Sequence, residues 1–313
     1  MATPILKAAH FQCEDAAFAY VEAALWPNGP VCPHCGATDR ISKMQGKSTR
    51  VGLYKCYRCR KPFTVRMKTI FESSHITLHL WLQAIHLLCS SKKGISSNQL
   101  HRTLGITLKS AWFLSHRIRE AMRDGSLAPM GGNGKTVEID ETVIGRQEDA
   151  PKRIGRGQVA FRNIVLTLVE RGGIARSWHV DGCTVGTLMP IIRGNLAKET
   201  AVMTDEASWY RNLKVNCDLA SHDAVNHGVK EYARYESQRT ISTNTVEGYY
   251  SIFKRGMKGV YQHCGERHLH RYLAEFDFRY SNRVALGCDD AERANRALLG
   301  VVGKRLTYQT ARN

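Results

Sequence analysis

Four cysteines in two close pairs constrain the fold of this chain more than any other feature. They are Cys32 with Cys35 and Cys56 with Cys59, in the spacing C-x2-C-x20-C-x2-C. Two thiolates in one tight turn bind an ion together, and two such turns complete a tetrahedral site of four sulfurs. Because this closed shell has no open position, we expect a structural Zn²⁺ ion. Redox-active cysteine pairs are the alternative.

The segment around these cysteines is too poor in apolar residues to build a core of its own. It runs from Val31 to about Lys68. A segment this small needs a further stabilising cross-link, such as a bound metal ion. Basic and aromatic side chains are interleaved along it, which suits contacts to phosphates, although a solvated charged surface would have the same pattern. These side chains are Lys47, Arg50, Tyr54, Lys55, Tyr57, Arg58, Arg60, Lys61 and Phe63.

The charge of the whole chain favours a polyanionic partner. Among 313 residues, 45 Lys and Arg stand against 28 Asp and Glu, which gives a net charge of +17. Nucleic acid is the most common such partner, and a basic enzyme without one is the alternative. We see no export signal and no apolar run of about 20 residues, so we expect a cytoplasmic protein without a membrane partner. In that reducing compartment the six scattered cysteines are predicted to be small buried side chains.

Helical periodicity is found before and after the cysteine segment. It predicts helices over residues 14–26, 75–89, 97–104 and 107–122. Gly105 separates the last two, and two helices about a turn with Gly fit a helix-turn-helix, although any three-helix domain can look like this. We take 107–122 as the candidate reader of the DNA major groove, with Lys109, His116 and Arg117 as its contacts.

Beyond a Gly- and Pro-rich linker at 125–134, the hydrophobic pattern changes from helices alone to a mixture of strands and helices, as in an α/β domain. Strands are predicted over 136–144, 163–170, 174–180 and 200–205, and helices over 184–196, 207–213, 244–257 and 268–279. The stretch between 213 and 244 shows no regular pattern. This order of strands and helices predicts a mixed sheet.

Three acidic residues lie at the ends of these elements. Asp140 is on the first strand, Asp205 ends a later strand, and Glu247 is in the first turn of a helix. If they converge, divalent cations must offset their charge, and two such ions can activate water against a phosphodiester. There are alternatives, because Asp205 and Glu247 could cap helices. Glu138 and Glu141 flank Asp140, so spacing alone leaves the choice on this strand open.

These motifs resemble those of bacterial insertion-sequence transposases that join an N-terminal zinc ribbon to an ISXO-like DDE domain with an RNase H-like fold. The matching segments follow the family order from about residue 11 to 283. They are Trp26-Pro27, Cys32–Gly36, Tyr54–Cys59, Phe63–Val65, Ser90–Ser96, Gln99–Gly105, His116–Met122, Val137–Thr142, Thr204-Asp205, Val225–His227, Thr243–Glu247, Phe253–Arg255, Gly259–Tyr261 and Glu275–Arg279.

The resemblance implies catalytic roles for five residues. Asp140, Asp205 and Glu247 would bind Mg²⁺, with Mn²⁺ as a substitute, and Glu138 and Glu141 would be directed elsewhere. Asn244 would hold the start of the helix that carries Glu247. Lys254, seven residues after Glu247 and near the same helix face, would contact a phosphate. One position departs from the family pattern, since Ser242 stands where the family often has His.

The resemblance also implies an architecture and an activity. Residues 1–68 would form a helix and zinc ribbon, 69–126 a helical DNA-binding unit, 135–285 an α/β, RNase H-like catalytic domain with a mixed sheet, and 286–313 a tail. The protein would nick the ends of its insertion sequence and join the 3′-hydroxyl ends to target DNA by two-metal-ion phosphodiester transfer. Its partners would be double-stranded DNA, as terminal inverted repeats and target, and further copies of itself at the bacterial nucleoid. The alternative is a catalytically inactive DNA-binding protein with a zinc ribbon and a helix-turn-helix.

Overall fold

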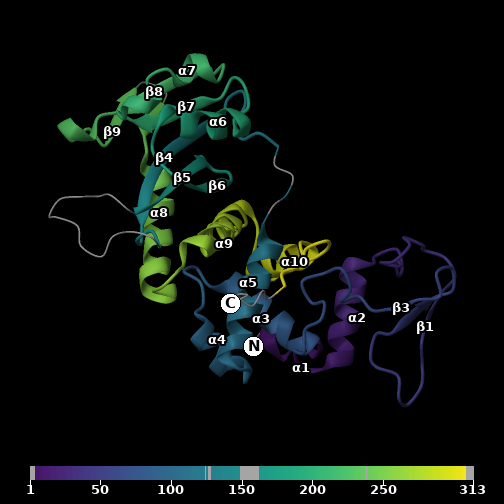
Figure 1. The fold of residues 1–313 in the computed structure, drawn as a ribbon. Helices are drawn as coiled ribbons and strands as arrows, with labels where there is room; N and C mark the ends of the chain where they lie inside the picture. Colours follow the sequence, from purple (N-terminus) through teal and green to yellow (C-terminus); the bar gives the residue numbers. More distant parts are fainter. Residues whose placement is uncertain (1–3, 124, 126–127, 149–161, 237–238, 308–313) are drawn as a thin grey trace. The chain divides into compact units, whose positions relative to one another are not determined.

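Residues 4–123, 125, 128–148, 162–236 and 239–307 are described by a computed structural model of the chain (Figure 1). The chain divides into two units. The first unit combines Met1–Arg123 with Asp289–Asn313, and the second covers Asp124–Cys288. Over the described residues, none of the helices combines the length and the apolar character that crossing a bilayer requires.

The first unit begins with short helices followed by a small sheet. The helices are η1 (Ile5–Lys7), α1 (Ala9–Gln12) and α2 (Glu14–Leu25). The antiparallel sheet has the order β1-β2-β3, from β1 (Ile41–Lys43), β2 (Tyr54–Cys56) and β3 (Pro62–Phe63). Its apolar core is small, with the ring of Trp26 packed edge-on against Tyr54 and Phe63.

Four further helices belong to the described part of the first unit. They are α3 (Leu78–Ser90), α4 (Ser97–Leu104), α5 (Leu108–Met122) and α10 (Asp290–Leu299). Gly105 ends α4 with a φ of 65°, and the Thr107 hydroxyl accepts a hydrogen bond from the Ser110 N–H at 3.2 Å to begin α5. The tail helix α10 packs against α3 and α5.

The second unit is built on a five-stranded mixed sheet (Figure 1). Its order is β6-β5-β4-β7-β8, with the first three strands antiparallel and β7 and β8 parallel to β4. This is the strand order of an RNase H-like fold, so the predicted fold class is confirmed. The strands are β4 (Thr136–Ile144), β5 (Asn163–Glu170), β6 (Ala175–Val180), β7 (Ala201–Asp205) and β8 (Ser221–Val225).

Helices cover both faces of this sheet. Alternate residues of β5 show this, because Leu166 and Leu168 belong to the core with α6 and α7, and Val165 and Val169 to the core with α8 and α9. The helices are α6 (Val185–Asn195), α7 (Leu213–Asn216), α8 (Asn244–Gly256) and α9 (Leu269–Ser281). The remaining elements are η2 (Ser208–Tyr210), η3 (His227–Val229), a hairpin of β9 (Ala233–Glu236) and β10 (Arg239–Ser242), η4 (Met257–Tyr261), η5 (Glu266–His268) and η6 (Val284–Leu286).

Two sequence-based expectations need correction at this level. The stretch after residue 213 contains α7, β8 and the β9–β10 hairpin. Polar residues such as His222 and Asp223 hide the strand pattern of β8, which is an edge strand with one sheet neighbour. Of the six scattered cysteines, Cys13 is exposed, because it lies at the junction of α1 and α2. Cys183 and Cys264 are half-buried, and only Cys89, Cys217 and Cys288 are buried.

An enclosed carboxyl group ties α8 and α9 to the sheet. Asp277 on α9 accepts hydrogen bonds from the Tyr249 hydroxyl at 2.6 Å and from the Ser177 hydroxyl and N–H, each at 2.8 Å. Burial raises the pKa of Asp277 to about 6, and the hydrogen bonds from Tyr249 and Ser177 oppose the shift.

We expect this carboxyl group to make the protein less stable as the pH rises from about 4 to about 6. Between its unfolded pKa near 3.9 and its folded pKa of about 6, the folded state binds more protons, so the free energy of unfolding falls with pH. Asp277→Asn should remove this part of the pH dependence, up to about 2 kcal/mol. Urea unfolding of both proteins at pH 4.5 and 7 measures it, and an unchanged pH dependence in the variant would contradict the assignment.

Candidate functional site

The four paired cysteine sulfurs meet at one point of the first unit. The Sγ atoms of Cys32 and Cys59 are 3.7 Å apart, as are those of Cys35 and Cys56, and all four lie within 4.8 Å of one another. A tetrahedral site with Zn–S bonds of about 2.3 Å separates its sulfurs by about 3.8 Å. The donor set and its spacing therefore fit the Zn²⁺ ion expected from the sequence.

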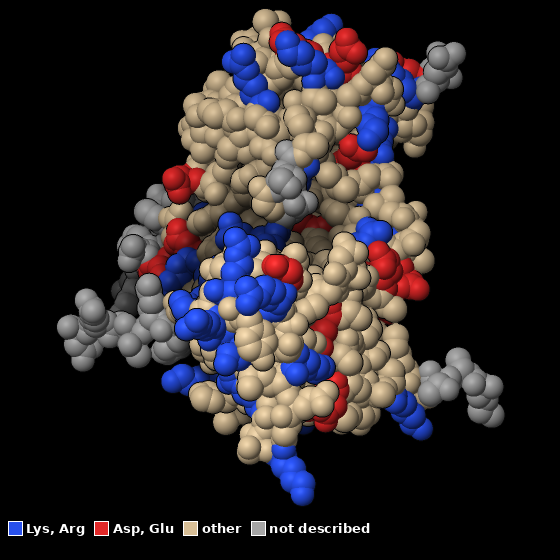
Figure 2. All heavy atoms as spheres, turned by 90° about the vertical axis from the view of Figure 1, so that its right-hand side faces the viewer, with Lys and Arg blue, Asp and Glu red and all other residues tan. Residues whose placement is uncertain are grey.

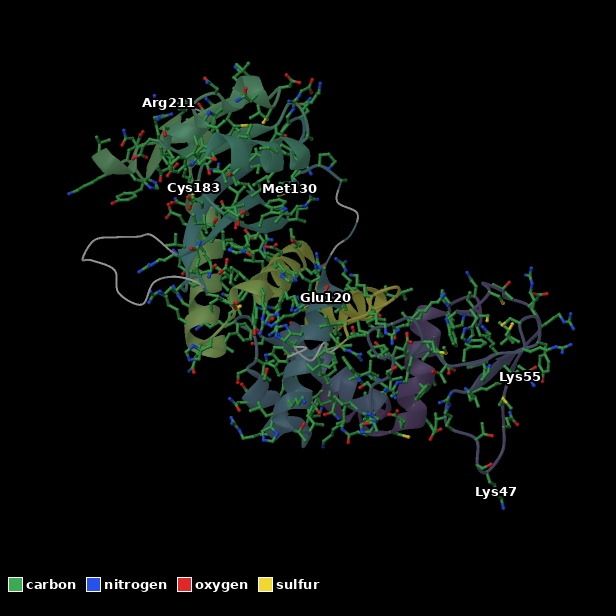
Figure 3. All side chains as sticks on the ribbon, in the orientation of Figure 1. Lys47, Lys55, Glu120, Met130, Cys183 and Arg211 are labelled. Carbon is green, nitrogen blue, oxygen red and sulfur yellow. The ribbon has the colours of Figure 1, made fainter. Side chains whose placement is uncertain are left out.

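The basic side chains near this cluster are mostly exposed. Lys47, Arg50, Arg58, Arg60 and Lys61 are exposed, and Lys55 is half-buried with its ammonium group 5.5 Å from the centre of the Tyr57 ring. Figure 3 labels Lys47 and Lys55 on the cysteine-containing segment of the first unit. Figure 2 shows Lys and Arg side chains, in blue, gathered on the face turned toward the viewer. This placement is compatible both with phosphate contacts and with a solvated charged surface.

Two of the three expected DNA contacts on α5 need correction. Lys109 is exposed, but His116 is 1% exposed and Arg117 is 4% exposed. The Arg117 guanidinium donates to the backbone carbonyls of Ile70 at 2.8 Å, Glu72 at 2.9 Å and Leu306 at 3.0 Å. Both side chains therefore lie in the interior of the first unit, where they cannot read DNA bases.

The acidic residues gather where β4 and β7 separate. These strands pair in parallel only over Thr136–Glu138 and Ala201–Met203, although β4 continues to Ile144 and β7 to Asp205. Beyond the paired part, carboxylate oxygens of Asp140, Glu141 and Asp205 lie within 4.8 Å of one another. The fold thus brings together two acids that are 65 residues apart in the sequence.

Glu141 is part of this cluster, so the expectation that it is directed elsewhere was wrong. Strand alternation places Glu141 on the opposite face from Asp140, but β4 has no β7 neighbour here and the longer side chain reaches the cluster. The Tyr210 hydroxyl donates to the Glu141 carboxylate at 2.5 Å and holds it there. Glu138 does point elsewhere, toward Arg171 and the start of α8.

The cluster has the electrostatics of a cation site. Burial, together with the negative charges of Glu141, Asp205 and Glu247, raises the pKa of Asp140 to about 8. Burial also raises the pKa of Glu141. The thiol of Cys183, labelled in Figure 3, has its pKa raised to about 11 by burial and by the same acids of β4 and β7. A divalent ion with a preference for oxygen ligands would offset the repulsion that disfavours ionisation here.

Glu247 lies near this cluster but outside its closest contacts. It is exposed in the first turn of α8, accepts a hydrogen bond from the Thr243 hydroxyl at 2.9 Å, and has His227 Nε2 at 3.7 Å. Its charge reaches Asp140, whose pKa it raises. His227 belongs to a motif quoted above, yet sequence reasoning gave it no role, because only the fold places it beside Glu247.

The remaining site residues lie on or next to α8. Asn244 is exposed in the first turn, and Lys254 is half-buried with its ammonium group 5.9 Å from the Tyr250 ring centre. Ser242, which stands where the family often has His, is buried, and its hydroxyl accepts a hydrogen bond from Arg171 at 3.0 Å. Asp205 also accepts a hydrogen bond from the Ala207 N–H at 3.0 Å, but the helix predicted over 207–213 is only the short η2, which Ala207 precedes without a side-chain cap, so Asp205 does not cap a helix here.

Two segments of the chain match domain models of IS1595 transposases. Residues 12–62 match the transposase zinc-ribbon domain, and residues 131–281 match the ISXO2-like transposase domain. A relative from Halobacterium salinarum, described as an uncharacterized protein in transposable element ISH50, is 26% identical over 269 residues, which are 81% of this chain and 86% of the relative. Because this relative is archaeal, the similarity is not confined to bacteria.

Two solved structures show only weak similarity. They are a pre-cleavage Mos1 transpososome and a Mos1 strand transfer complex, with TM-scores of 0.19 and 0.20 and sequence identities of 8% and 9%. Each match covers 66% of this chain, and 78% and 77% of the Mos1 chains. Superpositions this poor carry no argument about the site.

Proposed function

We propose that this chain, which carries the zinc ribbon and the ISXO2-like domain of IS1595 transposases, nicks the ends of its insertion sequence and joins the freed 3′-hydroxyl ends to target DNA. The observation that carries this proposal is the convergence of Asp140, Glu141 and Asp205 where β4 and β7 separate, with Glu247 nearby on α8. Clustered acids whose like charges repel and whose pKa values are raised are common at functional sites.

In this proposal Asp140, Asp205 and Glu247 hold two Mg²⁺ ions, for which Mn²⁺ can substitute, and Glu141 adds a fourth carboxylate. When bound, such ions supply an activated water and stabilise the leaving oxygen of a phosphodiester. The chain's own residues then position the DNA. Lys254, on the same face of α8 as Glu247, contacts a phosphate beside the scissile bond, and Asn244 lies in the first turn of the helix that carries Glu247.

The rest of the chain holds the DNA. We infer that residues 1–68 and 69–126 bind the terminal inverted repeats through the exposed Lys and Arg side chains of the ribbon and through Lys109. Residues 135–285 would be catalytic, and the tail at 286–313 would complete the first unit. The two ends of the insertion sequence and the target DNA must be held together during joining. We therefore infer that several copies of the chain form the active assembly, a homo-oligomer. It acts on double-stranded DNA at the nucleoid, in the cytoplasm.

The test separates cutting from binding. The purified protein, with its zinc retained, should nick linear DNA that carries the repeats flanking its gene when Mg²⁺ or Mn²⁺ is present, and leaving both of these ions out should abolish nicking but not binding. Gel analysis of end-labelled DNA shows the nick, and a mobility shift shows the complex. Binding without nicking at any concentration of either ion would instead support the alternative, a catalytically inactive DNA-binding protein.

A further inference from the structure

Glu138 is a buried carboxylate for which the proposed chemistry has no use. It is 0% exposed, and both of its oxygens accept hydrogen bonds. Oε2 accepts from the N–H groups of Thr245 at 2.7 Å and Val246 at 3.0 Å. Oε1 accepts from the Thr245 hydroxyl at 2.8 Å and from Nε of Arg171 at 2.6 Å. A buried charge is tolerated only with such partners, so these contacts depend on one another.

The two backbone donors belong to the first turn of α8. The N–H groups of a first turn have no partner within their own helix, and a negative charge there is favourable. Thr243, which precedes α8, gives no side-chain cap, so Glu138 caps the helix from β4. Sequence reasoning had given this role to Asn244. Glu247 is in the same first turn, so the contact that fixes the turn also fixes Glu247.

Arg171 holds the chain just before this helix. It follows β5, and its guanidinium donates to the carbonyls of Thr240 at 2.7 Å and Ser242 at 3.1 Å and to the Ser242 hydroxyl at 3.0 Å. Both acceptors are on β10, which leads into α8. One ion pair, Glu138 with Arg171, therefore holds both sides of the junction between β10 and α8.

The same strand carries the metal-binding acid. Glu138 and Asp140 are two residues apart on β4, so they share one face, about 7 Å apart along the strand. Tyr250, three residues after Glu247, donates its hydroxyl to the Asp140 carbonyl at 2.6 Å. Helix α8 is thereby bonded to β4 on both sides of Glu247, through Glu138 before it and through Tyr250 after it. The two contact points on β4, Glu138 and Asp140, are only two residues apart.

We propose that Glu138 and Arg171 are positioning residues that place Glu247 relative to Asp140 and Asp205 and so set the affinity of the site for divalent cations. The inference rests on the proposed function, because it takes Glu247 as a metal-binding acid. Without Glu138 the first turn of α8 loses its anchor, whereas Tyr249 and Tyr250 still hold the later turns. Glu247 then moves while the helix stays in place.

The test measures Mn²⁺ affinity by electron paramagnetic resonance of free Mn²⁺ in the full-length protein, without DNA. Partners that orient metal ligands typically change metal affinity about 10- to 100-fold. We expect Glu138→Gln to weaken Mn²⁺ binding by about this factor, because its amide nitrogen cannot accept a hydrogen bond and leaves Arg171 without its counter-charge. Thr245→Ala, which removes one hydrogen bond and no charge, should weaken it by a smaller factor.

Two comparisons separate positioning from a general loss of stability. Asp277→Asn alters an enclosed carboxyl that holds the same helix through Tyr249, and it should leave Mn²⁺ affinity unchanged. In a Glu247→Gln background, Glu138→Gln should cause no further loss. If Glu138→Gln fails to fold, Arg171→Lys and Thr245→Ala take its place.

The outcomes are distinct. The inference is overturned if Glu138→Gln, or its replacements, bind Mn²⁺ as the wild type does, or if Asp277→Asn weakens binding equally. A wild-type protein that binds no Mn²⁺ overturns the proposed function, and this inference with it.

Discussion

Replacing Asp205 with Asn should abolish both nicking and joining and leave binding to the element ends unchanged. The amide keeps the shape of the side chain but removes one negative charge from the group formed with Asp140 and Glu141. Neutral amides are poorer ligands for hard divalent ions, and losing a single charge-stabilising contact in a transition state costs about 100- to 1000-fold in rate. We therefore expect a fall of at least about 1000-fold, and the same for Asp140→Asn and Glu247→Gln.

The assay is nicking and joining of end-labelled DNA, with the binding constant measured on the same samples. Asp218→Asn is the matched control, because Asp218 is an exposed residue that precedes β8 and lies at the other end of the parallel strands from Asp205. It should retain wild-type rates. An acid whose variant still cuts within tenfold of the wild type does not belong to the site.

Removing zinc should unfold the ribbon while the second unit stays folded. The ribbon has only a small core around Trp26, Tyr54 and Phe63, so most of its stability must come from the metal. In small domains of this kind the free energy of zinc binding, about 10–16 kcal/mol, is also folding free energy. Cys56→Ser removes a sulfur that is 0% exposed and should have the same effect as chelation.

Two measurements on one sample check this. The wild type should contain one zinc per chain by atomic emission, and Cys56→Ser should contain none. Limited proteolysis should then cut Cys56→Ser, but not the wild type, between residues 31 and 63. Cys13→Ser, the same change at an exposed cysteine, should keep its zinc and its resistance. A ribbon that resists proteolysis without zinc would show that its apolar core suffices.

The features predicted well from the sequence are those encoded locally. Strand alternation predicted β4, a compact apolar run predicted β5, and the spacing of Cys32, Cys35, Cys56 and Cys59 predicted the ribbon whose sulfurs converge in the structure. The fold class followed from the order of strands and helices and from the family resemblance. In each case a few consecutive residues, or one fixed spacing, carry the physical constraint.

The features missed depend on contacts between distant parts of the chain. Arg117 looks like a surface cation in its own helix, but the carbonyl of Leu306, 189 residues later, is one of its acceptors. Glu138 looks like a redundant neighbour of Asp140 in the sequence. Its partners are two N–H groups in the first turn of α8, more than 100 residues later, which have no acceptor within their own helix. Glu141 joins the cluster because the pairing of β4 with β7 stops at Glu138. No local pattern predicts these partners.

The central claim is that the acids between β4, β7 and α8 bind the catalytic metal ions. An anomalous difference map from crystals soaked in Mn²⁺ tests it most directly. We predict peaks within about 2.5 Å of carboxylate oxygens of Asp140 and Asp205, with Glu247 or Glu141 completing the ligands. A map with Mn²⁺ bound at other sites, and no peak among these acids at saturating Mn²⁺, would contradict the account.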